Sequence, residues 1–362
     1  MIRLIELLIS MVIVAAVFLL VAIVLPSSRH LEETVETNRR MTIVYDTLNS
    51  FHRFKDWSPL ALRDPKIQLE KSGPEAGKGA RLQYTSTVDS IGSGAYEITD
   101  SVPGDHVAMS IDNQARGANK RTEFKLEHTG RNNRNVKITQ TYDVDYGWNL
   151  LGRYAGLYVS SNVGDDMQLG LTRLVSMLAS VPNVDYRMEG STLTDLKMDQ
   201  RPAEDLLVVN AGAVMRDNDA IMQSMKQNME WINRAIAANN LEAAGPMRII
   251  TTELSRDHYT FDVAVPVRRK GATPDAASAA MTDLKLSSPV TYLRNEPSRV
   301  ATARFTGHMA GLENVRNALR AWAMTQGESL TDRPYEIYTG GIDKAFSQDG
   351  VGEYQVIWAA QG

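Results

Sequence analysis

The sequence predicts an α+β protein that has an N-terminal transmembrane helix followed by two folded domains. Three observations lead to this prediction. Segment 7–25 contains a single polar side chain, Ser10. Beyond it, short segments alternate apolar and polar residues, which is typical of half-buried antiparallel strands. From about residue 205 onward, one order of strands and helix occurs twice.

Residues 4–25 are expected to form a membrane anchor. At a rise of about 1.5 Å per residue the apolar segment spans roughly 28 Å, close to the thickness of the hydrocarbon layer. The segment has to be helical because lipid offers no hydrogen-bond partners to a free backbone. Pro26 ends the helix. The sequence therefore predicts a single-pass anchor, residues 1–27, in a bacterial inner membrane.

Two properties of this anchor stay open. A cleaved signal peptide usually has a shorter apolar core and small residues at its cleavage site, whereas residues 24–26 are Val-Leu-Pro. The orientation is weakly coded, because Arg3 precedes the anchor while Arg29, Arg39 and Arg40 follow it. Counting cations favours a cytoplasmic body. Long domains cross membranes largely regardless of charge, however, so a periplasmic body remains an alternative.

The composition excludes several kinds of site. The chain has 43% apolar and 23% charged residues, as in a globular protein. Its net charge of −4 and the lack of a basic run argue against a nucleic-acid partner. Because there is no cysteine, disulfides and cysteine nucleophiles are excluded. The six histidines never lie at metal-ligand spacing, and no phosphate-loop or dinucleotide motif occurs, so we expect neither metal nor cofactor.

Residues 31–182 are predicted to form the first domain. Helical spacing over residues 41–54 is followed by Pro59, which stops a helix. Antiparallel strands are predicted by alternation at 81–88, 122–126 and 136–144. The domain closes with a helix whose apolar face is formed by Leu171, Leu174, Val175 and Leu178.

This order of elements resembles the START-like (SRPBCC, polyketide cyclase) family. The matching residues are FHRFKDWSP at 51–59 and the closing helix around Asp165, Met167 and Leu171. The resemblance implies a helix-grip fold, in which a sheet wraps around the last helix and leaves a deep apolar cavity. Trp57 would either close one end of the sheet as a core residue or line that cavity as a ligand-binding residue. No acid–base group for catalysis is evident in this half.

Residues 183–204 are polar and are predicted to form a linker, and residues 205–362 to form the second domain. In the first copy of the repeat a strand at 206–209 precedes a helix from about Asp219, followed by strands at 247–251 and 259–265. In the second copy the same elements are expected at 298–305, 312–322, 335–338 and 354–358. Two copies are too few for a solenoid, so we expect a pseudo-symmetric pair that shares one sheet.

The duplicated pattern resembles the GyrI-like effector-binding domain. The supporting segments are 231–232, 245–246, 262–267 and 333–338. The resemblance implies a groove between the copies, lined by aromatic residues, that takes small apolar or cationic molecules and often places an acidic residue against the cation. In the last strand, however, Gln355 occupies the position where that acid is expected.

Five residues of the second domain are therefore candidate ligand-binding residues: Tyr335, Glu336, Tyr338, Gln355 and Trp358. By strand alternation Glu336 and Tyr338 share one face, and Tyr335 shares the other face with Ile337. A buried glutamate beside tyrosines could hold a cation by its charge and by the aromatic faces. A solvated Glu336 is the alternative.

We expect a membrane-tethered, non-catalytic binding protein, a sensor or carrier for small hydrophobic molecules. One alternative is a hydrolase or isomerase of a lipophilic substrate, with Glu336 as general base and Tyr335 or Tyr338 as its hydrogen-bond partner. The other is a scaffold that binds a second membrane protein. Residues 4–25 would provide the contact with the membrane in each case.

Overall fold

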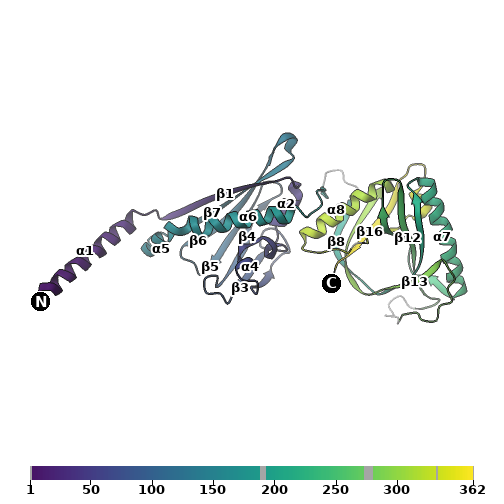
Figure 1. Ribbon diagram of the computed structural model, residues 1–362, viewed down its shortest axis with the longest axis horizontal. Coiled ribbons are helices and arrows are strands. Elements are labelled where there is room, and N and C mark those ends of the chain that lie inside the picture. Colours follow the sequence, from purple (N-terminus) through teal and green to yellow (C-terminus); the bar gives the residue numbers. More distant parts are fainter. Residues whose placement is uncertain (1, 188–192, 273–279, 332, 362) are drawn as a thin grey trace. The chain divides into compact units, whose positions relative to one another are not determined.

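The computed structural model describes residues 2–187, 193–272, 280–331 and 333–361. The chain divides into two compact units, Met1–Asn183 (unit 1) and Val184–Gly362 (unit 2) (Figure 1). Each unit contains an antiparallel sheet together with helices, so the predicted α+β class is confirmed.

Unit 1 begins with α1 (Ile2–Val24), an apolar helix whose side chains are exposed along most of its length. Its segment Ile5–Val24 is long and apolar enough to cross a membrane, a property that it shares with signal sequences. The last helical hydrogen bond runs from Leu25 N to Val21 O (3.0 Å). Pro26 follows and has no N–H with which to continue the helix.

Seven antiparallel strands form the sheet of unit 1 in the order β1-β7-β6-β5-β4-β3-β2. Their bounds are β1 (Ser28–Thr37), β2 (Gln68–Ser72), β3 (Arg81–Thr85), β4 (Ser93–Val102), β5 (His106–Asn113), β6 (Ala118–Thr129) and β7 (Asn135–Asp145). Helices α2 (Met41–Leu48), α3 (Phe54–Trp57) and α4 (Pro59–Arg63) lie between β1 and β2. The chain continues from β7 into α5 (Leu150–Ala155) and α6 (Asp165–Leu178).

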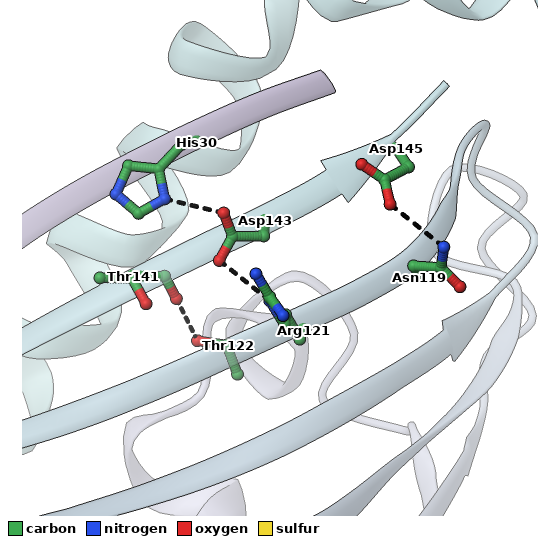
Figure 2. Close-up of polar contacts among 7 residues, drawn as sticks. All are labelled: His30, Asn119, Arg121, Thr122, Thr141, Asp143 and Asp145. Carbon is green, nitrogen blue, oxygen red and sulfur yellow. Dashed lines mark hydrogen bonds and ion pairs between the residues drawn. The ribbon is translucent and has the colours of Figure 1, made fainter. Parts of the chain in front are cut away.

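The edge strand β1 is missing from the sequence-based prediction because its residues are mostly polar. Every second side chain of β1 is half-buried, since an edge strand on this sheet turns only one face inward. Figure 2 shows how β1 is joined to the sheet: Asp143 of β7 contacts His30 of β1 at 2.8 Å and Arg121 of β6 at 3.2 Å. The helix predicted over 41–54 is interrupted and forms α2 and α3 instead.

The core of unit 1 forms where α6 packs against β1 and α3. Met167, Leu171, Leu174 and Leu178 of α6 are buried, as the predicted apolar face requires, while Val175 is only half-buried.

Unit 2 has a nine-stranded sheet in the order β13-β9-β12-β11-β15-β16-β14-β8, and β10 pairs with β12 beside this path. The strands are β8 (Leu193–Arg201), β9 (Glu204–Met215), β10 (Leu241–Ala243), β11 (Arg248–Leu254), β12 (His258–Arg269), β13 (Val290–Asn295), β14 (Ser298–Gly307), β15 (Tyr335–Tyr338) and β16 (Gly352–Ala359). The helices are α7 (Asn218–Ala238), α8 (Leu312–Thr325) and α9 (Gly341–Ala345).

The strand order confirms a pseudo-symmetric pair that shares one sheet. The first copy supplies β9, α7, β11 and β12, and the second supplies β14, α8, β15 and β16. The copies meet where β11 pairs with β15, with Ile249 opposite Glu336. Helix α7 packs on strands of the first copy and α8 on strands of the second.

Three strands of unit 2 were not predicted from the sequence: β8, β13 and the short β10. Residues 193–201 fall in the expected linker, yet they form β8 and pair with β14 of the second copy. In the same way β13, which precedes the second copy, pairs with β9 of the first copy. The expected linker 183–204 is therefore wrong for these residues: the copies exchange their first strands, so a polar segment is held at the edge of the sheet by backbone hydrogen bonds.

Candidate functional site

Unit 2 contains a pocket of about 140 Å³ beside the N-terminal ends of α7 and α8. Strands β11, β12 and β15 contribute Leu254, Tyr259 and Tyr338 to its wall. The two helices and the adjacent turns contribute the remaining lining residues: Arg216, Asn218, Ile221, Met309, Ala310, Leu312, Glu313 and Arg316. Most of the wall is aliphatic or aromatic, and its charged groups are arginines and one glutamate.

A buried ion pair stands at the inner end of this pocket. Arg316 of α8 donates from Nε to Glu336 Oε1 (2.6 Å) and from Nη2 to Glu336 Oε2 (3.0 Å). Its Nη2 also donates to the hydroxyl of Tyr259 (3.3 Å), which in turn lies 3.0 Å from Thr251 Oγ1. Glu336 is 0% exposed, so its charge depends on this bidentate partner rather than on water.

The electrostatics of the pair keep Arg316 protonated. Burial by itself lowers the pKa of Arg316, but the charge and hydrogen bonds of Glu336 outweigh this and raise the pKa above its ordinary value. Since both carboxylate oxygens of Glu336 accept from the guanidinium, the carboxylate has little left to offer a ligand. The pair is therefore a neutral structural unit inside the pocket wall.

Tyrosines around the pair are held in their un-ionised form. Burial, followed by the charge of Glu336, raises the pKa of Tyr259 to about 12. Burial likewise raises the pKa of Tyr338 well above its ordinary value. Tyr354 of β16 packs its ring edge against Tyr338 at 5.0 Å, and burial raises its pKa to about 12. These side chains act as aromatic walls and neutral hydrogen-bond groups.

The predicted site residues of unit 2 are divided between the two faces of the sheet. Tyr338 lines the pocket, and Glu336 lies behind Arg316 on the same face. Trp358 alternates onto that face too, but it is buried, does not line the pocket and donates from Nε1 to the carbonyl of Thr331.

Tyr335 and Gln355 point to the opposite face. There Tyr335 belongs to a cluster of buried strand residues that includes no helical residue. The guanidinium of Arg248 lies 4.9 Å from the Tyr335 ring centre, so that ring already has a cation. Gln355 donates from Nε2 to Thr302 Oγ1 (3.1 Å). Neither residue is part of the pocket, because the alternation of a strand separates them from Tyr338.

The prediction missed Arg316 and Tyr259, which the structure brings together with Glu336. One signal for Arg316 is present in the sequence. The buried face of α8 carries Leu312, Val315 and Leu319, and Arg316 lies within this apolar stripe. An arginine in a buried helical stripe requires a buried acid, and Glu336 is that acid.

Trp57, the candidate in unit 1, is a buried core residue. Its ring makes edge contacts with Phe54 (5.4 Å) and Phe124 (5.9 Å). Its Nε1 is buried and lacks a hydrogen-bond partner within the described part of the chain. Trp57 therefore packs as the predicted core residue, while its unpaired N–H leaves a polar group inside unit 1.

Further along the same sheet, unit 1 carries a group of polar residues. Tyr96 and Tyr142 are half-buried, and Asp166 of α6 forms an ion pair with Arg63. Burial raises the pKa of Tyr142 to about 12. Burial also raises the pKa of Asp166, although Arg63 opposes the effect. Among the described residues no group of three or more histidine, aspartate or glutamate side chains could hold a metal ion.

The comparisons with known proteins concern mainly unit 1. Residues 28–179 match the family described as "Polyketide cyclase / dehydrase and lipid transport". Unit 1 therefore contains a START-like domain of this family, as its sequence motif predicted. A search of curated proteins finds no match to the chain.

Three solved structures illustrate the remaining similarity. Norcoclaurine synthase from Thalictrum flavum, in complex with dopamine and hydroxybenzaldehyde, has 10% identity and a TM-score of 0.33, over 42% of this chain and 86% of that one. The C-terminal domain of EcmrR has 14% identity and a TM-score of 0.36, over 46% of this chain and 97% of that one. Zhui aromatase/cyclase from Streptomyces sp. R1128 has 13% identity and a TM-score of 0.31, over 41% of this chain and 92% of that one.

Glu336→Gln is expected to lower the free energy of unfolding by about 3–5 kcal/mol, because it leaves the buried charge of Arg316 without its partner. Chemical denaturation of the full chain in detergent measures this. Glu313→Gln is the matched control, since Glu313 pairs with Arg216 at the exposed rim (3.3 Å) and should change stability by about 0–1 kcal/mol. Equal effects of the two variants would contradict a structural role for the inner pair.

Tyr354→Phe is expected to leave the free energy of unfolding unchanged or to raise it by about 1–2 kcal/mol. Its hydroxyl is buried without a hydrogen-bond partner in the described structure, so removing it relieves a desolvation cost. Tyr259→Phe is the control and should destabilise by about 1 kcal/mol, because its hydroxyl is bonded to Thr251 and Arg316.

Alkaline pH tests the same tyrosines. Their folded-state pKa of about 12 lies above the ordinary value of 10.0, so the folded state keeps a proton that the unfolded chain loses. Stability is therefore complete below pH 10 and falls as the pH rises towards 12. Unfolding curves at several pH values, with tyrosinate absorbance, measure the loss, which should be smaller in Tyr354→Phe. A stability that is level from pH 9 to 12 would contradict these pKa values.

Proposed function

We propose that this chain is a membrane-anchored, non-catalytic binding protein for small uncharged apolar molecules. The observation that carries the proposal is the pocket of unit 2, in which apolar and aromatic side chains surround charges that are already paired. The family matched by unit 1 supports the same class of function, because its description includes lipid transport. Both units thus favour the binding of small hydrophobic molecules.

The charge pattern defines the ligand class. Arg316 is paired with Glu336, and Arg216 with Glu313. A cationic ligand therefore meets no free carboxylate in the wall, and a carboxylate ligand would have to displace an existing acid. Neutral molecules face neither penalty, since they need only displace water from Ile221, Leu312 and Tyr338.

The volume limits the size of the ligand. A cavity of about 150 Å³ accommodates a molecule the size of benzene, and the pocket measures about 140 Å³. Drug-sized ligands occupy pockets of roughly 300–1,000 Å³. We therefore propose a single aromatic ring or a short aliphatic molecule as the ligand of unit 2.

The chemistry of Glu336 argues against the hydrolase alternative. A general base must accept a proton within hydrogen-bond reach of its substrate. Both oxygens of Glu336 accept hydrogen bonds from Arg316 instead, and protonation would break a buried ion pair. This supports binding without turnover.

Contacts at the end of α1 support an anchor that is retained rather than cleaved. Arg153 of α5 donates from Nη1 to the carbonyls of Ala22 (3.3 Å), Ile23 (2.8 Å) and Leu25 (3.2 Å). These are carbonyls that the end of a helix leaves without a helical partner. If the segment were removed, this buried arginine would lose the three acceptors at the end of α1 and keep only those within unit 1, such as Gly147 O.

Neutral single-ring molecules such as phenol and indole are expected to raise the melting temperature of the full chain in detergent. At a concentration of 100 Kd the stabilisation is about 2.7 kcal/mol. Benzoate and benzyltrimethylammonium should give no shift, because the pocket has no unpaired charge. Differential scanning fluorimetry measures both, and equal shifts from the charged compounds would contradict the proposed ligand class.

Ala310→Trp is expected to abolish the shift by filling the pocket, since Ala310 is an exposed residue of its wall. Ala237→Trp is the control, because Ala237 is exposed on α7 and does not line the pocket. A shift that survives in Ala310→Trp would assign binding to unit 1 and overturn the role of this pocket.

The full-length chain is expected to remain in the membrane fraction after an alkaline carbonate wash, with its N-terminal segment intact. The mass of the purified chain measures this directly. A chain that starts near residue 27 would identify α1 as a signal peptide and would contradict the anchor.

A further inference from the structure

Unit 1 exposes a group of apolar and aromatic side chains directly after β7. Trp148 is 81% exposed, Leu151 55%, Leu157 48% and Tyr158 65%. They lie at the start of α5 and on the short 3₁₀ helix η2 (Gly156–Tyr158) that follows it. We call residues 148–158 the apolar segment of unit 1. Side chains of this kind are costly to leave in water, so such a group marks a contact surface.

This segment lies against the C-terminal part of α1 (Figure 1). Tyr154 stacks on Phe18 with ring centres 4.2 Å apart and donates its hydroxyl hydrogen to the carbonyl of Phe18 (2.8 Å). Arg153 binds the last carbonyls of α1 and also donates from Nη2 to Gly147 O (2.7 Å). The contacts of Arg153 and Tyr154 therefore fix the segment to α1.

The position of Phe18 sets the depth of the segment. Phe18 precedes the end of α1 at Val24 by about 9 Å along the helix axis. If residues 7–25 span the hydrocarbon layer, Phe18 lies inside its edge, so Tyr154 reaches below the interface into the outer part of that layer. Arg153 binds the carbonyls at the end of α1 and therefore marks the boundary between lipid and water. Trp148, whose ring centre is 5.5 Å from the Arg153 guanidinium, lies near this boundary.

We propose that residues 148–158 form a second membrane-contact element, which inserts Trp148, Leu151, Leu157 and Tyr158 into the bilayer interface next to α1. Tryptophan and tyrosine prefer this zone because their rings are apolar and their N–H or O–H groups remain hydrated. Arg153 lies 5.5 Å from the Trp148 ring centre and is the single charged residue in segment 146–164. No acidic side chain of this segment repels an anionic lipid surface.

A lipid surface fits this element better than a protein partner does, because the element continues the exposed apolar surface of α1. The neighbouring outer face of the sheet has the opposite character. There His30, Arg121 and Asp143 form an exposed polar network, and Asn119 contacts Asp145 (Figure 2). The contact with lipid is therefore limited to the apolar segment and does not extend over the sheet.

The absence of cysteine from the chain gives a direct test. Leu151→Cys and Tyr158→Cys are labelled with an environment-sensitive fluorophore in the full chain, which is reconstituted into phosphatidylethanolamine–phosphatidylglycerol vesicles. Nitroxide-labelled lipids are expected to quench both positions at least twofold more than Leu62→Cys. Leu62 is the matched control, being 49% exposed on α4 of the same unit.

Because the inference rests on the proposed anchor, Val12→Cys in the middle of α1 separates the two. Quenching at Val12 together with Leu62-like signals at both test positions overturns the contact element and leaves the anchor in place. Quenching at the test positions without quenching at Val12 supports the element and overturns the anchor. Signals at the Leu62 level everywhere overturn both.

Discussion

The buried contact between Arg316 and Glu336 is the interaction on which unit 2 depends most. Glu336 lies on β15, the strand where the two copies meet, and Arg316 lies on α8, so the pair joins the helical layer to the seam of the sheet. Neither charge has enough water to be stable alone. The same guanidinium also contacts Tyr259 and so helps to shape the pocket. Because Arg316 lines the pocket and is paired with Glu336, the desolvation cost of this pair is accompanied by a pocket wall in which the arginine charge is already neutralised.

Strand alternation predicted the parts of the fold that turn one face to a core. It identified β3, β6 and β7 because every second residue of such strands is mostly apolar. It missed β1 and β8, which lie at the edges of their sheets and are rich in charged residues. Charges protect an exposed edge from pairing with other chains, but they also erase the pattern by which a strand is recognised. The duplication was visible because the same order of strand, helix and two strands occurs twice along the sequence.

The candidate site was only partly predictable, for a related reason. Alternation correctly grouped Glu336 with Tyr338 and separated both from Tyr335. It could not say which group faces the helices, because that depends on where α7 and α8 pack, which involves residues distant in the sequence. Gln355, chosen from a family pattern, lies with Tyr335 on the other face. Tyr338 was the one predicted residue that lines the pocket, and the arginine in the buried stripe of α8 was a further signal that the prediction did not use.

In unit 1, Arg153 likewise satisfies polar groups that would otherwise lack a partner, the carbonyls at the end of α1. The end of a spanning helix leaves carbonyls without partners, and lipid supplies none. Arg153 provides donors to three such carbonyls, while its stem and the neighbouring aromatic rings remain apolar. In the proposed membrane-anchored arrangement, these contacts would fix the START-like unit close to the bilayer. Since small apolar molecules concentrate in lipid, this placement would favour the ligand capture that we propose. The hydrogen bonds to the end of α1 also account for the one charged residue of segment 146–164, Arg153.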